Sequence, residues 1–269
     1  MPSALTRSCQ CTFLLFQAKT HPKGKIKMKW SITRTVSPHD LDLNDIASPS
    51  AFLRFMQEAA YMQMQYCKPT MSELRAENKA FVVSRLTMSL YAPLRVCDEI
   101  TATSWACDSK GVSFLRCSEI TKDGQRIAEL ASVWAMVNPE TRSLWRVSDY
   151  EPQYETDQPS ELDLPARIRV PKETALSLAG EYRVGYNDAD LNKHINNTHY
   201  PDILCGFLPS MEGKRVIKFS ISYIHEAPIG TTLKVYVSKE DDGVFWIRTV
   251  NEDGSVNVES EIVLEQISG

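Results

Sequence analysis

Asp190-Leu-Asn-Lys-His-Ile-Asn-Asn197 decides how this 269-residue chain is organised, because a weaker copy of it lies one domain-length earlier. The earlier copy reads Asp42-Leu-Asn-Asp-Ile-Ala-Ser48. The aspartate and the asparagine keep their spacing, and Ile46 stands where the later copy has His194. The two copies indicate a duplicated scaffold in which only the second half carries the full set of polar groups.

Each copy is followed by the same succession of expected elements. Apolar residues recur at helical spacing from Phe52 to Tyr66, and again from Tyr200 to Leu208. Strand-like runs rich in β-branched and aromatic residues follow each helix. They are Phe81–Val83, Leu86–Tyr91, Ile100–Trp105, Val112–Ile120 and Ile127–Val137, then Val216–Tyr223, Thr232–Val237, Val244–Val250 and Val256–Leu264.

Turn sequences also match between the halves. Gly124 and Gly254 each follow an aspartate between two alternating runs, which is a strong hairpin signal. Arg116 and Arg248 each lie five residues after a turn glycine. An α+β architecture is expected, with an antiparallel sheet that curls around one long helix in each half. We predict an N-terminal domain over 28–147, a linker over 148–177 and a C-terminal domain over 178–269.

Composition excludes several classes of protein. The net charge of −4 does not favour nucleic-acid binding, and no apolar run is long enough to cross a membrane. The seven cysteines show no zinc-ligand or disulfide spacing, so no metal, no cofactor and a reducing cytoplasm are expected. Residues 1–27 are basic and contain no acid. They are a plastid-type transit peptide or, as their low serine and arginine content favours, an upstream start before Met28 that lies outside the fold.

The later copy combines groups that suit chemistry on a carbonyl. If the segment is extended, Asp190, Asn192 and His194 project to one face. Asn196 and Asn197 then stand where a helix starts, and free N–H groups at a helix start stabilise an oxyanion. A purely structural histidine is the alternative. Ile46 argues against it, because the first copy builds an equivalent helix start without histidine.

A second polar group appears about thirty residues later. His225 and Glu226 interrupt a strand-like run over Lys218–Ile224, whereas the corresponding Ser89–Leu94 has no charge. The difference between the halves favours Glu226 as a site residue over an exposed edge group.

Together, Asp-x-Asn-x-His-x-Asn-Asn and the later Tyr-x-x-Glu resemble the signature of the acyl-(acyl carrier protein) thioesterases of plants and bacteria. The resemblance covers roughly residues 28–265 and implies a tandem hotdog fold without cofactor. It implies a hydrolase of fatty acid biosynthesis that releases free fatty acid from the 4′-phosphopantetheine-linked acyl chain of acyl carrier protein. Its site residues fall on Asp190, Asn192, His194 and Glu226. Plant members usually have cysteine after the glutamate, and Ala227 stands there, so water attack or Glu226 itself must serve.

The roles expected on this basis follow from the residue types. Asn192 and the helix-start N–H groups, including those near Asn196 and Asn197, would polarise the thioester carbonyl. Glu226 would be the general base or, alternatively, the nucleophile, and His194 would order the water. Asp190 would orient its neighbours.

The first half is expected to supply the acyl pocket, and a basic patch is expected to dock the acidic carrier protein. Pocket candidates are Phe52, Phe55 and Met56, for which ordinary core packing is an equal alternative. Docking candidates are Arg183, Lys193 and Arg215. Hydrolysis of acyl-CoA at the same site, a non-catalytic acyl-thioester-binding hotdog, and a homodimer stay open.

Overall fold

The computed structural model describes residues 26–27 and 29–267, and the expected residues 1–25 of the leader lie outside this range. The first half contains the long helix α1 (Pro49–Tyr66) and the short α2 (Met71–Ala76). Its main strands are β2 (Trp30–Thr35), β3 (Ala80–Leu90), β4 (Glu99–Ala106), β5 (Phe114–Lys122), β6 (Gln125–Val137) and β7 (Leu144–Trp145).

The second half repeats this order with a shorter helix. Its elements are β9 (Leu176–Arg183), α3 (Tyr200–Cys205), β10 (Lys214–Tyr223), β11 (Thr232–Ser238), β12 (Val244–Val250) and β13 (Val256–Gln266). Single 3-10 turns lie at η1 (Pro38–Asp40), η2 (Val147–Asp149), η3 (Tyr186–Asp188) and η4 (Asn197–His199). The expected strand-like runs form strands in both halves, except that Phe81–Val83 and Leu86–Tyr91 belong to the single strand β3.

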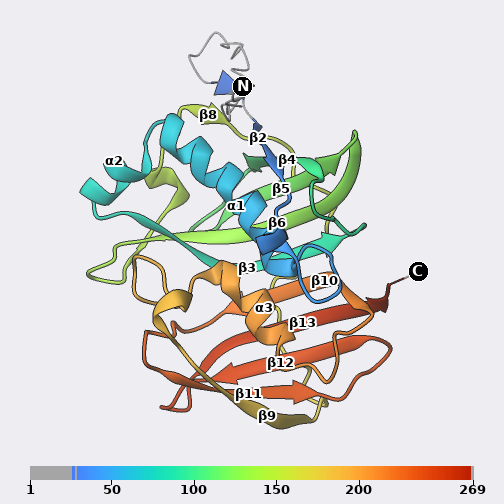
Figure 1. Ribbon diagram of the computed structural model, residues 1–269. Helices are drawn as coiled ribbons and strands as arrows, with labels where there is room; N and C mark the ends of the chain where they lie inside the picture. The colour runs from blue at the N-terminus through green and yellow to red at the C-terminus, as the bar shows by residue number, and fades with distance from the viewer. Residues whose placement is uncertain (1–25, 28, 268–269) are drawn as a thin grey trace, which may run out of the picture.

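The main strands of the two halves form one continuous sheet rather than two separate ones (Figure 1). The order is β2-β4-β5-β6-β3-β10-β13-β12-β11-β9, so the second half mirrors the first across β3 and β10. At this junction Thr87 pairs with Ser220, and their hydroxyl oxygens lie 3.0 Å apart. Because the order is mirrored, β5 and β12 occupy equivalent places, as do β6 and β13.

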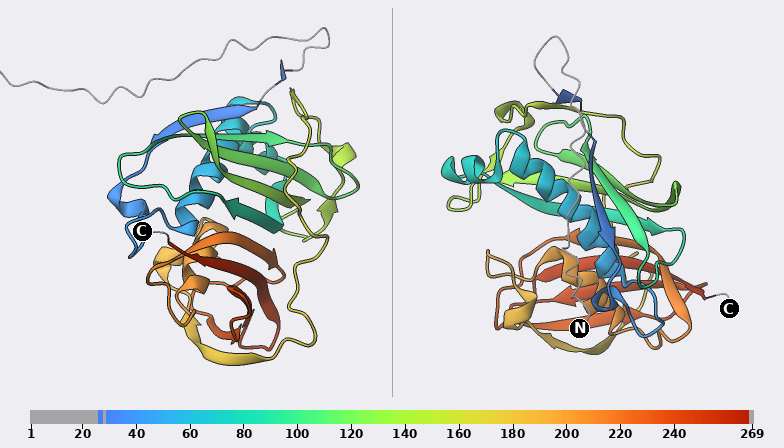
Figure 2. Two further views of the ribbon diagram at one scale, coloured as in Figure 1. Left: turned by 90° about the vertical axis from the view of Figure 1, so that its right-hand side faces the viewer. Right: turned by 45° about the horizontal axis from the view of Figure 1, so that its top comes forward.

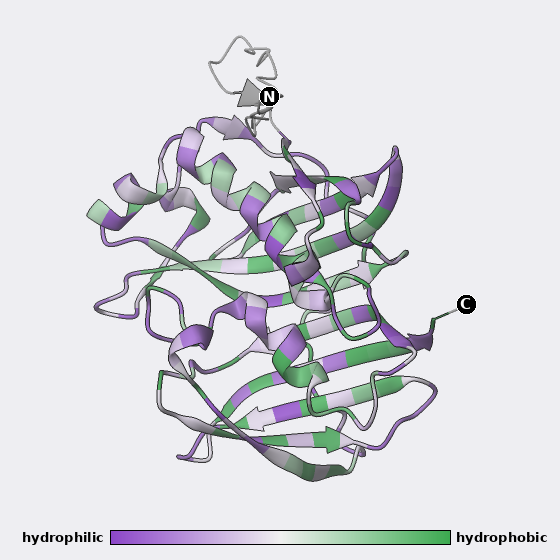
Figure 3. Cartoon of the chain, in the orientation of Figure 1, coloured by the Kyte–Doolittle hydropathy of each residue, from purple (hydrophilic) through white to green (hydrophobic). Residues whose placement is uncertain are grey.

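Helix α1 begins where its sequence dictates. Ser48 caps its first turn by accepting a hydrogen bond from the Ala51 N–H at 3.2 Å, and Pro49 suits the first helical position. Phe52, Met56 and others at helical spacing are buried against the sheet, and the hydropathy colouring shows apolar and polar residues alternating along α1 (Figure 3). Both α1 and α3 cover the same face of the sheet (Figure 1).

The prediction of a long helix in the second half is wrong. Helix α3 has six residues, and η4 precedes it. After Cys205 the chain makes two tighter turns, in which the N–H groups of Phe207 and Leu208 donate to carbonyls three residues back. Pro209 has no N–H and disfavours a helical conformation for the residue before it, so the helix cannot continue.

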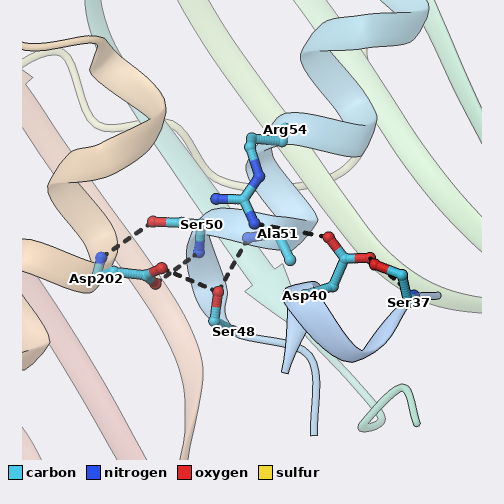
Figure 4. A network of polar contacts seen from close by, with 7 residues as sticks. All are labelled: Ser37, Asp40, Ser48, Ser50, Ala51, Arg54 and Asp202. Atoms are coloured by element: carbon cyan, nitrogen blue, oxygen red, sulfur yellow. Dashed lines mark hydrogen bonds and ion pairs between the residues drawn. The ribbon is translucent and has the colours of Figure 1, made fainter. Parts of the chain in front are cut away.

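The starts of α1 and α3 meet at the junction of the halves (Figure 4). Asp202 accepts hydrogen bonds from the Ser48 hydroxyl at 3.0 Å and the Ser50 N–H at 3.1 Å, and its own N–H donates to the Ser50 hydroxyl. On the other side, Asp40 accepts from the N–H and hydroxyl of Ser37, and a guanidinium nitrogen of Arg54 lies 3.7 Å from its carboxylate. These contacts fix the two helix starts against each other.

The segment between the halves runs along the first-half sheet (Figure 2). The Gln158 carbonyl accepts from the Trp105 indole, and the Pro165 carbonyl accepts from Arg85. Within it, β8 (Tyr154–Glu155) pairs with β1 (Ile26–Lys27). In the described part of the chain, no helix has the length and apolar character needed to cross a membrane.

Candidate active site

The two copies of the opening stretch fold into the same loop. In the second half the Asp190 N–H donates to the His194 carbonyl at 3.0 Å, and in the first half the Asp42 N–H donates to Ile46 at 2.8 Å. Each loop has one residue with a left-handed backbone, Lys193 at φ 65° and Asp45 at φ 58°. The repeat seen in the sequence is therefore a structural repeat.

The expectation of an extended segment is wrong. The Asp190 carboxylate accepts from the Asn192 N–H at 2.8 Å and from the Asn192 side-chain amide at 3.2 Å, so the loop turns back on itself. Aspartate favours such turns because its carboxylate can accept from the backbone two residues on. Asp190 thus holds Asn192, which is exposed to solvent.

His194 and Glu226 come together as the sequence suggested. Nε2 of His194 lies 3.3 Å from Oε2 of Glu226, and the two side chains are 25% and 42% exposed, so solvent and substrate can reach both. The backbone arranges the approach. Residue His194 forms a β-bridge with Pro228, and the Ile195 N–H donates to the Ala227 carbonyl at 3.0 Å.

A third member of the group comes from the first half. Nη1 of Arg142 donates to Oε1 of Glu226 at 2.6 Å, so each carboxylate oxygen has its own partner. Arg142 lies in the hairpin between β6 and β7, with φ 61°, and its N–H donates to the Asn138 carbonyl. Sequence reasoning missed Arg142, because 84 residues separate it from Glu226 and no local pattern marks it.

Arg142 also determines the charge on Glu226. The hydrogen bond from its guanidinium is the main cause that holds the pKa of Glu226 below its ordinary value, against the opposing effect of partial burial. Proximity to His194 lowers the pKa further. Glu226 is therefore ionised at neutral pH and can accept a proton.

Asn196 and Asn197 are held in structural contacts. The Asn196 side-chain oxygen accepts from the Thr198 N–H at 3.0 Å and from its hydroxyl at 2.9 Å, so it caps η4. The Asn197 carbonyl accepts from the Tyr223 hydroxyl at 3.1 Å. The Asn197 side-chain oxygen is buried, and no hydrogen-bond partner for it lies among the described residues.

The first-half loop has no equivalent of this polar group. The Ala47 N–H donates to the Leu94 carbonyl, just as the Ile195 N–H donates to the Ala227 carbonyl. When these two hydrogen bonds are matched, Pro93 occupies the position of Glu226. Pro93 and Ile46 line an apolar crevice of about 10 Å³. The same scaffold thus exists with and without the acid and the imidazole.

A large cavity lies in the first half, with a volume of about 660 Å³. Helix α1 contributes Gln57, Ala60, Tyr61 and Met64 to its wall. The expected pocket residues Phe52, Phe55 and Met56 are not in the wall, because they lie on the neighbouring face of α1 and pack into the main core. The sequence identified the helix and not the face that lines the cavity.

The cavity and Glu226 lie toward the same end of the central strand pair. Arg85 of β3 pairs with Ser222 of β10, so the start of β3 and the residues after β10 extend in the same direction. Phe81, near the start of β3, lines the cavity. Val147 also lines it, five residues after Arg142, which is at most about 17 Å of extended chain.

The expected docking residues separate into two places. Arg183 and Lys193 are exposed and flank the turn at Ile229–Gly230. In this turn the Ile229 N–H donates to the Lys193 carbonyl, and the Gly230 N–H donates to the Val184 carbonyl. Arg215 lies elsewhere: it lines the first-half crevice, forms an ion pair with Glu265 and donates to the carbonyls of Leu90 and Tyr91. The structure does not bring Arg215 to Glu226, because the length of β10 separates them.

Comparison with known families decides the identity of the chain. Residues 25–151 match the acyl-ACP thioesterase N-terminal domain, and residues 172–266 match the acyl-ACP thioesterase C-terminal domain. The chain belongs to the acyl-ACP thioesterase family. Oleoyl-acyl carrier protein thioesterase 2 of Arabidopsis thaliana is 27% identical over an alignment of 188 residues, and the match covers 61% of this chain and 50% of that protein. The chain spans about half the length of the curated relatives it matches.

Solved structures of this thioesterase class share the fold. An acyl-ACP thioesterase from Bacteroides thetaiotaomicron superposes with a TM-score of 0.78 at 21% identity, covering 88% of this chain and 98% of that one. The 12:0-ACP thioesterase from Umbellularia californica gives 0.75 at 15% identity, covering 88% and 97%. The α+β tandem hotdog expected from the sequence is confirmed.

Proposed function

We propose that the protein hydrolyses the thioester of fatty acyl-acyl carrier protein and releases free fatty acid. The observation that carries this is the pair of His194 and Glu226, whose side chains lie 3.3 Å apart in the second half. Membership of the family supports the substrate class.

The pair acts on water. An ionised Glu226 takes a proton from the water that attacks the thioester carbon, and Nε2 of His194 holds that water or passes the proton to the leaving sulfur. Arg142 keeps one oxygen of Glu226 occupied, so the other oxygen faces the imidazole.

Asn192 supplies the stabilisation of the oxyanion. Its amide nitrogen uses one hydrogen on Asp190 and has a second hydrogen for the carbonyl oxygen of the substrate. A donor fixed before the reaction stabilises the developing negative charge without reorganisation. Asp190 is a positioning residue, because it acts through Asn192.

The first-half cavity accommodates the acyl chain. It falls within the size range of pockets that bury small ligands, and aromatic and methionine side chains form much of its wall. The direction of β3 and β10 and the short chain distance from Arg142 to Val147 support an approach from Glu226 into this cavity.

Purified protein tests the proposal with acyl-acyl carrier protein as substrate and fatty acid release as the readout. Glu226→Gln and His194→Ala should each lower kcat by about 10²–10³. His225→Ala is the matched control, because this exposed imidazole is adjacent in sequence and bonds only to the Val256 carbonyl among the described residues. It should stay within about twofold of the unmodified protein.

Two results would contradict the proposal. Hydrolysis that survives both substitutions in folded protein would remove the pair from the reaction, and binding without any hydrolysis would indicate a non-catalytic hotdog. Acyl-CoA is measured beside acyl-acyl carrier protein, and the larger kcat/KM identifies the carrier. If the carrier protein docks on Arg183 and Lys193, kcat/KM for the carrier-protein substrate should fall as the salt concentration rises.

A further inference from the structure

The wall of the first-half cavity contains a cation without a carboxylate partner. Arg116 of β5 lines the cavity and directs Nη1 to Oε1 of Gln63 at 2.9 Å and to the Ser104 hydroxyl at 3.1 Å. Among the ion pairs formed by residues 29–267, none includes Arg116. A half-buried guanidinium whose partners are all neutral has unmet capacity for a negative or electron-rich group.

The second half shows that the fold does not require a cation at this place. The equivalent strand β12 directs Phe245 and Ile247 toward its helix, and both are fully buried in the main core. Arg248, which matches Arg116 in sequence spacing, lies on the opposite face and pairs with Glu259 at 2.6 Å. The sequence spacing pairs Arg116 with Arg248, but the two side chains lie on opposite faces of the sheet. A shift of one residue along a strand moves a side chain to the other face.

The surroundings of Arg116 are polar where a simple acyl pocket needs only apolar groups. On the neighbouring strand Ser132 is the cross-strand partner of Arg116 and accepts from the indole N–H of Trp134, which lines the cavity. On α1, which also lines the cavity, the side-chain amide nitrogen of Gln57 is buried, and no partner for it is present among the described residues. The wall thus offers donors from both the sheet and α1.

The carboxylates in the wall do not neutralise Arg116. Asp108 is exposed and accepts a hydrogen bond from the Thr156 hydroxyl, and Glu155 belongs to the segment that runs over the surface. The remaining wall includes Phe81, Phe114 and Trp134, so the cation is set in a mainly apolar enclosure.

From this arrangement we propose that the cavity selects acyl chains that carry an oxygen group far from the thioester, a hydroxyl or a carboxylate, which Arg116 and Gln57 bind. His194 and Glu226 are not part of the cavity wall, so a group held by Arg116 is on the chain and not at the reacting carbon. The inference rests on the proposed function for its substrate and adds the chemical class of the acyl chain.

The test compares three acyl-acyl carrier proteins of equal chain length: an unsubstituted chain, an ω-hydroxy chain and an ω-carboxy chain. The oxygenated chains should give a kcat/KM at least about tenfold above the unsubstituted chain, since a hydrogen bond to a charged group is worth that factor or more. A preference for only one of the two oxygenated chains identifies which group the cavity binds.

Variants of the wall make the test specific. Arg116→Leu, which gives the wall the apolar character of β12, should lower kcat/KM for oxygenated chains about tenfold and leave the unsubstituted chain unchanged or improved. Ser132→Asp should also lower kcat/KM for oxygenated chains although Arg116 is still present, because the new carboxylate on the adjacent strand would pair with its guanidinium. Arg116→Lys should retain part of the preference.

Binding to the Glu226→Gln variant separates this inference from the proposed function. Calorimetry with the free fatty acid, its ω-hydroxy form and the dicarboxylic acid needs no catalysis. Tighter binding of the oxygenated acids, lost in a second variant with Arg116→Leu added, supports the inference even if no thioester is hydrolysed. Equal kcat/KM for the three chains, or a preference that Arg116→Leu does not change, overturns it while hydrolysis itself stands.

Discussion

Arg142, Glu226 and His194 form a short chain of contacts in which the middle residue has a partner on each oxygen. The first half supplies Arg142, and the second half supplies the other two. Neither half alone therefore contains the complete group.

Substitution of Arg142 should change the pH dependence of hydrolysis. Arg142 lowers the pKa of Glu226, and Glu226 must be ionised to accept a proton, so on the proposed mechanism the unmodified protein should keep activity to low pH. Arg142→Met removes the hydrogen bond and the charge, so the pKa rises and the acid limb of kcat/KM moves to higher pH. Arg142→Lys should lie between the two. An acid limb that stays in place in Arg142→Met would show that Arg142 does not control Glu226.

Asn44 and Asn192 occupy the same position in the two loops and should respond differently to alanine. The Asn44 amide donates to the carbonyls of Met211 and Lys214 and accepts from the Gly213 N–H, so it joins the halves. Asn192 contacts only Asp190 among the described side chains. Asn44→Ala should lower the free energy of unfolding by about 1–3 kcal/mol and spare kcat, whereas Asn192→Ala should lower kcat and spare stability.

Urea unfolding and steady-state kinetics on both variants check this pair of expectations. Loss of stability in Asn192→Ala together with loss of activity in Asn44→Ala would contradict both expectations.

Among the elements, the two helix starts at the junction carry the most polar contacts. Asp202 accepts from Ser48 and Ser50, which are both buried, and its negative charge lies at the start of α1, where the helix dipole favours it (Figure 4).

Asp202→Ala should therefore lower the free energy of unfolding by about 1–3 kcal/mol, because it leaves two buried donors without their acceptor. Asp202→Asn keeps an acceptor oxygen and loses the charge, so it should cost less. Urea denaturation measures both. Equal stability of the alanine variant and the unmodified chain would show that water replaces the carboxylate at no cost.

Sequence patterns predicted the strands well and the helices in part. Alternating apolar residues in β12 and β13 and the Asp-Gly turns between strands are local signals, so the meanders could be read directly. The second helix was overestimated because the apolar spacing from Tyr200 to Leu208 continues through two tighter turns that have a similar period. The face of α1 that lines the cavity could not be predicted, since periodicity shows that a face is buried and not what lies opposite it.

Contacts between distant segments explain the other omissions. Arg142 reaches Glu226 across a hairpin, and Arg116 meets its cavity only because the strands curve over α1. Such contacts depend on the tertiary arrangement and leave no trace in residue spacing.

For the whole molecule, a main core and a main sheet that both halves share predict a single unfolding transition. Phe52 of the first half and Phe219 of the second belong to the same buried cluster, and β3 pairs directly with β10. Circular dichroism and tryptophan fluorescence should give the same midpoint in urea, because the halves are joined through the sheet and through this buried cluster. Two separated transitions would show that the halves unfold independently.

The union of β3 and β10 within one polypeptide also has a genetic consequence. In an assembly of two identical chains, one codon change alters both copies of a position at once. Here Pro93 and Glu226 are encoded separately, as are Ile46 and His194, so a mutation in one half leaves its counterpart intact. Each half therefore accumulates its own substitutions, and a residue that is incompatible with the polar group at one position is tolerated at its counterpart.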